Sequence, residues 1–177
     1  TLIISVWKGT DPKNLVFWKD LIDPAAPVRE LVSDFRAKYS HAGDMGRTFW
    51  FLTDLDAPRG RVVSIDLALP EANAWRELVP QDKDTLESVH AVGGRLVGSY
   101  LRDAHSVVRT FAFDGAPLGE IPLPGLGTVS GFSGERGDME SFFGFAGFTM
   151  PSAVYRHDFA SGTYALFRAP KLDFDPA

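Results

Sequence analysis

Arg-Val-Val-Ser-Ile-Asp-Leu, residues 61 to 67, decides the fold because a run of the same character returns at a constant interval. Its counterparts are Leu-Val-Phe-Trp-Lys-Asp-Leu (15 to 21), Val-Val-Arg-Thr-Phe-Ala-Phe-Asp (107 to 114) and Ala-Val-Tyr-Arg-His-Asp-Phe (153 to 159). The four runs start at 15, 61, 107 and 153, so each start lies 46 residues from the next. Repeats of this length that contain several short strands and no helix are typical of β-propeller blades.

A second set of positions keeps the same period. Ile3, Phe49, Leu96 and Phe142 each lie in an apolar run and are separated by 46, 47 and 46 residues. A propeller blade is a sheet of four antiparallel strands, labelled a to d from the axis outward, and these two sets are assigned to strands b and c. We therefore predict an all-β chain of about four propeller blades.

The repeat also predicts where each blade begins and ends. The chain is expected to form a partial propeller over 1–177, with a first blade that starts at strand b. The predicted segments are blades at 1–35, 36–82, 83–124 and 125–170, followed by an exit linker at 171–177.

Both faces of each predicted sheet are hydrophobic, as in Phe-Trp-Phe-Leu at 49–52, which a blade needs when it is packed between two neighbours. The missing inner strand favours a part of a larger ring of six to eight blades, cut from a longer protein. The alternative is a complete four-bladed ring, which would be a compact monomer. A partial ring would instead expose apolar blade faces and tend to aggregate or dimerise.

Composition excludes several functions. The net charge is -5 and no run of Lys or Arg occurs, so we expect no nucleic-acid partner. Cysteine is absent, which excludes disulfides, thiolate metal sites and a Cys nucleophile. The longest apolar runs are strand-sized, so no transmembrane helix fits. We expect a soluble protein without a membrane partner, and the sequence leaves open whether it is cytoplasmic or periplasmic.

Four aspartates end the repeated strands: Asp20, Asp66, Asp114 and Asp158. A carboxylate before a turn can accept backbone N–H bonds, so we interpret these residues as turn-forming. The histidines, His41, His90, His105 and His157, lack metal-site spacing, and we expect no metal.

Two stretches resemble functional motifs but lack part of the required pattern. The Gly-rich stretch 125–134 lacks the spacing of a phosphate loop and precedes a predicted strand instead of a helix, so we interpret it as a crowded inner strand. Around Ser133 the sequence is Gly-Phe-Ser-Gly-Glu, which departs from the G-x-S-x-G nucleophile elbow at its last position.

Longer stretches carry a resemblance to a known family. They are Ile-Ile-Ser-Val-Trp-Lys-Gly-Thr-Asp-Pro-Lys-Asn (3 to 14), Phe-Leu-Thr-Asp-Leu-Asp-Ala-Pro-Arg-Gly-Arg (51 to 61), and the runs at 118–134, 148–158 and 167–176. In order and spacing they resemble the second half of the propeller of prolyl oligopeptidases, over essentially the whole chain.

The resemblance implies a seven-bladed propeller within a longer protein, here called the parent protein. That protein would be a serine endopeptidase, a hydrolase that cleaves short peptides after proline with a Ser, Asp and His triad. The triad would lie on an α/β-hydrolase peptidase domain of the same parent chain. This chain would then hold no catalytic residue and need no cofactor.

The resemblance also implies that the propeller gates substrate access and lines part of the substrate cavity. The positions that match the family's cavity contacts are Trp7 and Thr10. Many relatives carry Arg at the first position and some carry Cys at the second, so this sequence departs from the family at both. A Trp would make the subsite more apolar.

Repeat symmetry extends this expectation to the other blades. If the b-c turn of one blade faces the peptidase domain, the b-c turns of the others lie on the same face. The predicted interface residues are Asp54, Asp56, Arg59, Arg102, Asp103, His105, Thr149 and Met150. The rival hypothesis is a non-enzymatic β-propeller whose turns bind another protein.

Overall fold

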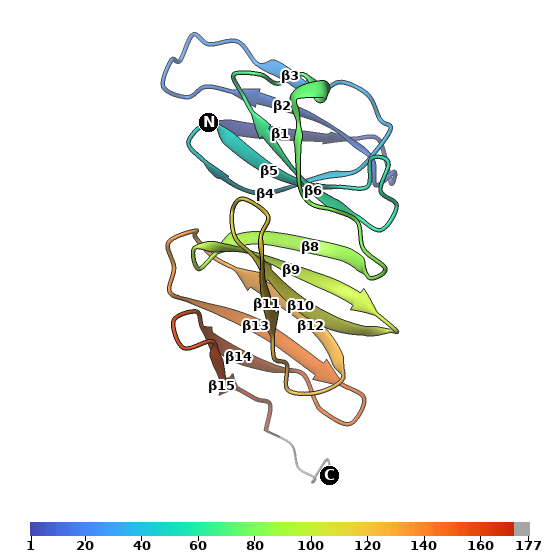
Figure 1. Cartoon of the computed structure of the whole chain (residues 1–177), viewed down its shortest axis with the longest axis vertical. Helices are drawn as coiled ribbons and strands as arrows, with labels where there is room; N and C mark the ends of the chain where they lie inside the picture. The colour runs from blue at the N-terminus through green and yellow to red at the C-terminus, as the bar shows by residue number, and fades with distance from the viewer. Residues whose placement is uncertain (172–177) are drawn as a thin grey trace. The chain divides into compact units, whose positions relative to one another are not determined.

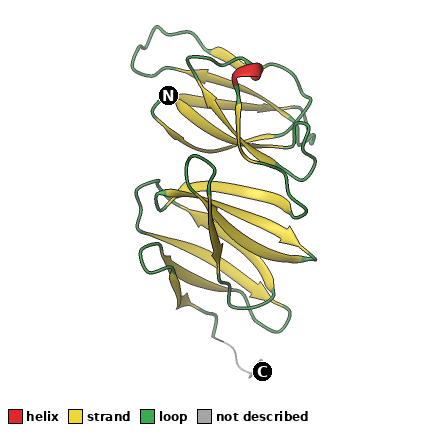
Figure 2. Cartoon of the chain, viewed as in Figure 1, coloured by secondary structure: helices red, strands yellow, loops and turns green. Residues whose placement is uncertain are grey.

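The structure is a computed structural model that describes residues 1–171, in which fifteen strands and one short 3-10 helix are formed (Figures 1 and 2). Neighbouring strands in every sheet are antiparallel and follow one another in chain order. One sheet has three strands and three sheets have four. The predicted fold class, all-β with four antiparallel sheets of the propeller type, is confirmed.

The chain divides into two compact units, described separately. Unit 1 comprises Thr1–Pro80 and unit 2 begins at Gln81. The strands of unit 1 form two sheets. Sheet 1 holds β1 (Leu2–Trp7), β2 (Asn14–Lys19) and β3 (Arg29–Val32), and sheet 2 holds β4 (Tyr39–Met45), β5 (Thr48–Thr53), β6 (Arg61–Asp66) and β7 (Arg76–Val79). The helix η1 spans Ala72–Ala74. Sheet 1 has three strands, in the order β1-β2-β3.

Unit 2 contains sheets 3 and 4. Sheet 3 holds β8 (Thr85–Val92), β9 (Arg95–Arg102), β10 (His105–Phe111) and β11 (Pro117–Ile121), and sheet 4 holds β12 (Gly127–Ser133), β13 (Glu140–Gly147), β14 (Ala153–Asp158) and β15 (Thr163–Arg168). Strands b and c of all four sheets lie where the 46-residue period predicts them. The blade boundaries remain predictions, and residues 172–177 of the predicted exit linker lie outside the described part of the chain.

Each unit has a core made by its two sheets. In unit 1, Val16 of sheet 1 and Ile65 of sheet 2 belong to one cluster, and both are fully buried. In unit 2, Val108 of sheet 3 clusters with the aromatic residues of sheet 4. There the Phe143 ring stacks on Phe132 with centroids 4.6 Å apart. Sheets that bury both faces explain why the predicted strands are apolar at consecutive positions.

The four repeated aspartates form one kind of turn, here called the Asp turn. In each, an Oδ1 atom accepts the N–H of the residue two positions later. The donors and distances are Ile22 to Asp20 at 2.9 Å, Ala68 to Asp66 at 2.8 Å, Ala116 to Asp114 at 3.0 Å and Ala160 to Asp158 at 2.9 Å. The interpretation of these residues as turn-forming is confirmed.

The Gly-rich stretch forms strand β12, and the segment that follows leads into strand β13. At Gly127 a Cβ atom would lie 2.2 Å from the carbonyl oxygen of Ala146 on the paired strand, so a side chain cannot be accommodated. Crowding therefore explains this glycine, as predicted, and it arises from the neighbouring strand of the same sheet. Helix η1, the one helix formed by residues 1–171, has too few residues to cross a bilayer.

Candidate functional site at the b-c turns

The first b-c turn presents Trp7 to solvent. Trp7 is the last residue of β1 and its side chain is 58% exposed, which is unusual for the largest apolar side chain. Its cross-strand neighbour is Asn14, the first residue of β2. Thr10 lies exposed in the turn between them, next to Gly9, whose φ of 61° is in the left-handed region. The two predicted cavity residues therefore lie together on one hairpin.

Asn14 anchors this turn to the segment that joins sheets 1 and 2. Its backbone N–H donates to the Ala37 carbonyl at 3.2 Å. Its side chain accepts from the Tyr39 N–H at 2.7 Å and donates to the Tyr39 carbonyl at 3.1 Å. A fully buried amide with these partners explains why a polar residue begins an apolar strand.

The same segment is hydrogen-bonded to the b-c turn of sheet 2. The Lys38 N–H donates to Asp54 Oδ1 at 2.7 Å. Through Asn14, Lys38 and Asp54, the turn of sheet 1 and the turn of sheet 2 lie at one end of unit 1. Within this unit, Trp7, Thr10 and Asp54 are therefore brought to a common end.

The rest of the second b-c turn contains both exposed residues, such as Asp56 and Arg59, and buried ones, such as Ala57 and Gly60. Asp56 has a φ of 51° and lines a cavity of about 420 Å³ in unit 1, together with Leu55, Arg61 and Trp75. Arg59 is exposed near the end of the turn. Asp54 thus holds the turn, whereas Asp56 borders open space.

The b-c turn of sheet 3 is a tight hairpin. Arg102 and His105 are cross-strand neighbours, so only Asp103 and Ala104 connect the two strands. Both connecting residues have positive φ, 44° and 64° respectively, which is the backbone of a two-residue hairpin turn and is costly for Ala. Asp103 is exposed and His105 is half-buried.

The fourth b-c turn contains Thr149 and Met150. Thr149 is exposed, whereas Met150 packs against the core of unit 2 and exchanges backbone hydrogen bonds with Gly147. The third and fourth turns belong to one end of unit 2, because Ser106, next to His105, accepts the Val129 N–H at 3.0 Å. That interaction joins sheets 3 and 4 near their b-c turns.

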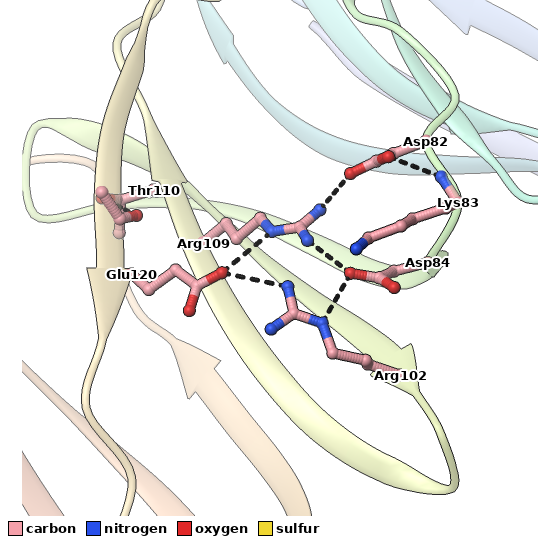
Figure 3. A network of polar contacts seen from close by, with 8 residues as sticks. Asp82, Lys83, Asp84, Arg102, Arg109, Thr110 and Glu120 are labelled. Atoms are coloured by element: carbon pink, nitrogen blue, oxygen red, sulfur yellow. Dashed lines mark hydrogen bonds and ion pairs between the residues drawn. The ribbon is translucent and has the colours of Figure 1, made fainter.

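Sequence reasoning missed an ion network around Arg102. Figure 3 shows two arginines and three acids in contact: Asp82, Asp84, Arg102, Arg109 and Glu120. Arg102 Nε lies 2.9 Å from Asp84 and its Nη2 lies 3.2 Å from Glu120. Arg102 is thus engaged inside unit 2, although the sequence predicts it as an interface residue.

Burial and the two arginines act in opposite directions on Asp84. Burial alone would raise the pKa of this carboxyl, but the hydrogen bonds and charges of Arg102 and Arg109 outweigh it and lower the pKa. The Arg109 guanidinium also lies over the Tyr100 ring, 4.5 Å from its centroid. Burial raises the pKa of Tyr100 to about 12, so the phenol stays neutral beside these charges.

The described residues offer no metal centre. Among residues 1–171 no group of three or more His, Asp and Glu side chains is arranged to hold a metal ion. His41, His90 and His157 each have a pKa lowered first of all by burial. The b-c turns present one exposed indole and several charged side chains.

Four antiparallel sheets in chain order, with Asp turns at one end and varied turns at the other, define a β-propeller module. The family model for the N-terminal β-propeller domain of prolyl oligopeptidase matches residues 1–170. The chain therefore belongs to this family.

Two curated relatives illustrate the match. The prolyl endopeptidase of Elizabethkingia meningoseptica is 27% identical over 175 residues, which cover 99% of this chain and 24% of the relative. The prolyl oligopeptidase ophP of Omphalotus olearius is 32% identical over 176 residues, covering 94% of this chain and 21% of the relative. The chain thus spans about a quarter of the length of these relatives.

Solved structures give the same picture. A structure from an analysis of two prolyl endopeptidases, on inter-domain dynamics in catalysis and specificity, matches with a TM-score of 0.90 and 33% identity. The match covers 98% of this chain and 25% of that one. The apo form of prolyl oligopeptidase B from Galerina marginata matches with a TM-score of 0.87 at 24% identity, which supports the fold alone.

Proposed function

We propose that this chain is the non-catalytic propeller part of a prolyl oligopeptidase, a serine endopeptidase that hydrolyses short peptides after proline. The propeller gates access to the peptidase domain, and its b-c end lines part of the substrate cavity. The observation that carries the proposal is the family match over residues 1–170. Chemistry is supplied by the peptidase domain of the parent protein.

Trp7 and Thr10 are the proposed cavity residues. An indole that is 58% exposed at the end of a strand offers a flat apolar surface to a bound peptide. Asn14 and its buried hydrogen bonds hold the opposite strand in register, so the indole is presented from a stiff hairpin. The peptide would meet an apolar contact here, where an Arg would favour acidic side chains.

The test is a change of charge at this position in the parent protein. Trp7→Arg is expected to raise kcat/KM for proline peptides with acidic side chains relative to neutral ones, by about tenfold for one new ion pair of ~1.4 kcal/mol. Leu21→Arg is the matched control, because Leu21 is also 58% exposed but lies within the Asp turn at the opposite end of β2. Equal selectivity in both variants would refute a cavity role for Trp7.

The chain by itself is expected to have no peptidase activity on a chromogenic proline peptide. Turnover by the purified chain would contradict its assignment as a non-catalytic part.

The other b-c residues, Asp54, Asp56, Arg59, Asp103, His105 and Thr149, are proposed to face the peptidase domain. Arg102 and Met150 lie at the same ends, but the Arg102 guanidinium is engaged by Asp84 and Glu120 and Met150 packs on the core of unit 2, so their contribution is to hold the turns. Asp54 accepts one backbone N–H and is exposed, so it can do both. A structure of the parent protein with these turns directed away from the peptidase domain would rule this out.

A further inference from the structure

The ion network in unit 2 joins the segment that leads into sheet 3 to strands β9, β10 and β11 of that sheet. Asp82 and Asp84 belong to the segment that leads into β8, Arg102 ends β9 beside the b-c turn, and Glu120 lies on the outer strand β11 (Figure 3). Arg109, on β10, contacts all three acids: Asp82 at 2.7 Å, Glu120 at 3.3 Å, and Asp84. The two arginines therefore tie the entry, the turn and the outer edge of sheet 3 together.

Burial makes this network different from an ordinary surface ion pair. The side chain of Asp84 is only 6% exposed and that of Arg109 is 15% exposed. A buried carboxylate without partners is costly, and removing one partner leaves the other charge uncompensated. Each guanidinium reaches different carboxylates through separate nitrogens, Arg102 two of them and Arg109 three, so this network constrains geometry as well as charge.

The segment held by the network includes a strained turn. Asp103 and Ala104 both have left-handed backbone angles, which an Ala adopts only when its surroundings impose them. The Arg102 guanidinium, anchored on Asp84 and Glu120, fixes the residue immediately before this turn. On the other side, Ser106 is anchored to Val129.

We propose that this network is a positioning device for the third b-c turn. Arg102 and Arg109 are positioning residues that hold Asp103 and His105 in a fixed orientation. Asp103, exposed at the tip, is the residue that meets a cationic group of the peptidase domain. This last step rests on the proposed function, whereas the positioning role does not.

Hydrogen exchange in the parent protein tests the positioning role. Arg102→Gln is expected to speed exchange of the amides at 102–106 by about tenfold, since a charge-assisted bond that contributes ~1.4 kcal/mol is lost. Glu120→Gln, at a position whose side chain is 51% exposed, is expected to act in the same direction. Arg156→Gln is the matched control, because it breaks an exposed pair with Glu140 at 3.6 Å in the same unit.

Faster exchange at the turn in the first two variants, with no change in the control, supports the positioning role. Unchanged exchange in Arg102→Gln overturns it.

Kinetics test the partner role separately. Asp103→Asn is expected to leave exchange at the turn unchanged and to alter KM or kcat of the parent protein by severalfold. Unchanged kinetics in Asp103→Asn overturn the contact with the peptidase domain, while the exchange result still decides the positioning role. The assay for turnover by the purified chain still decides the proposed function.

Discussion

At one end of every sheet the same Asp turn recurs, whereas the four b-c turns at the other end differ in length and in chemistry. The b-c turns occupy 8–13, 54–60, 103–104 and 148–152. One exposes an indole, one borders a cavity, one is strained and tied to an ion network, and one packs a Met on the core. Repetition indicates a structural role, and variation between blades indicates that each turn has its own contacts.

The largest effect is expected at Gly93, in the a-b turn of sheet 3. A Cβ atom there would lie 2.3 Å from the ring of Phe159, which is buried and lies within the Asp turn between Asp158 and Ala160. Gly93→Ala should lower the free energy of unfolding by about 2 kcal/mol more than Gly94→Ala, because overpacking adds to backbone strain. Gly94 has a similar φ, 71° against 63°, but open space around it.

Unfolding of these variants should be followed by circular dichroism, since all four Trp residues lie within residues 1–80 and do not report on unit 2. Equal losses in the two variants would mean that Phe159 can move aside and that this end of the sheet is loosely packed.

A smaller effect is expected from removing one Asp turn. Asp66→Ala loses the 2.8 Å bond from the Ala68 N–H and should lower the free energy of unfolding by about 1 kcal/mol. Asp66→Asn keeps an acceptor oxygen, so its free energy of unfolding should stay within about 0.5 kcal/mol of that of the unsubstituted protein. Tryptophan fluorescence suits this test, because Trp50 lies in the same sheet and Trp75 directly precedes its last strand. An Ala variant with an unchanged free energy of unfolding would contradict the structural role of the turn.

Acid should weaken unit 2 through His157, whose neighbour Asp158 begins an Asp turn. Burial first, and then the charge of Arg95, lower the pKa of His157 from 6.5, although Asp158 opposes this. The unfolded chain therefore binds the proton more readily, and the free energy of unfolding should fall as pH drops below about 6.5. The free energy of unfolding, measured with denaturant at pH 7.5 and 5.5, should differ less between the two pH values in His157→Phe than in the unsubstituted protein.

That replacement suits the site because the imidazole packs edge-on against Phe132 and Phe159, and its Nδ1 has no hydrogen-bond partner among the described residues. An identical pH dependence in the variant would assign the effect to other groups, such as His41 and His90.

The smallest change in stability is expected at the b-c end. Trp7→Ala removes a side chain that is 58% exposed, so the free energy of unfolding should change by less than about 0.5 kcal/mol. A loss several times larger, measured by urea unfolding, would mean that Trp7 is a packing residue and would weaken the contrast between the two ends.

Much of the fold could be predicted because its signals are local or periodic. Val16 and Ile65 lie on c strands assigned from the 46-residue spacing, and both are core residues. The Asp turn could be predicted because donor and acceptor lie two residues apart. Trp7 was identified only through the family resemblance, and the structure adds its exposure.

The ion network could not be predicted, because its members lie between positions 82 and 120 without a regular spacing. Arg109 and Glu120 are cross-strand neighbours only in the register that the structure defines, which includes a shift next to Thr110. The packing of Met150 on the core of unit 2 could not be predicted either, because nothing nearby in the sequence indicates it. The sequence therefore predicts Met150 only as an interface residue.

The sequence by itself therefore determined the all-β class, the four sheets and the turns that Asp residues hold. The turns depend on hydrogen bonds between residues two positions apart, and the sheets on apolar runs that recur at a fixed period, so both can be recognised along the chain. Only the tertiary structure decided that Arg102 is held by Asp84 and Glu120, and that Asp103 is left at the tip. Ion pairs between distant segments depend on strand register and burial, and these arise only when the sheets pack.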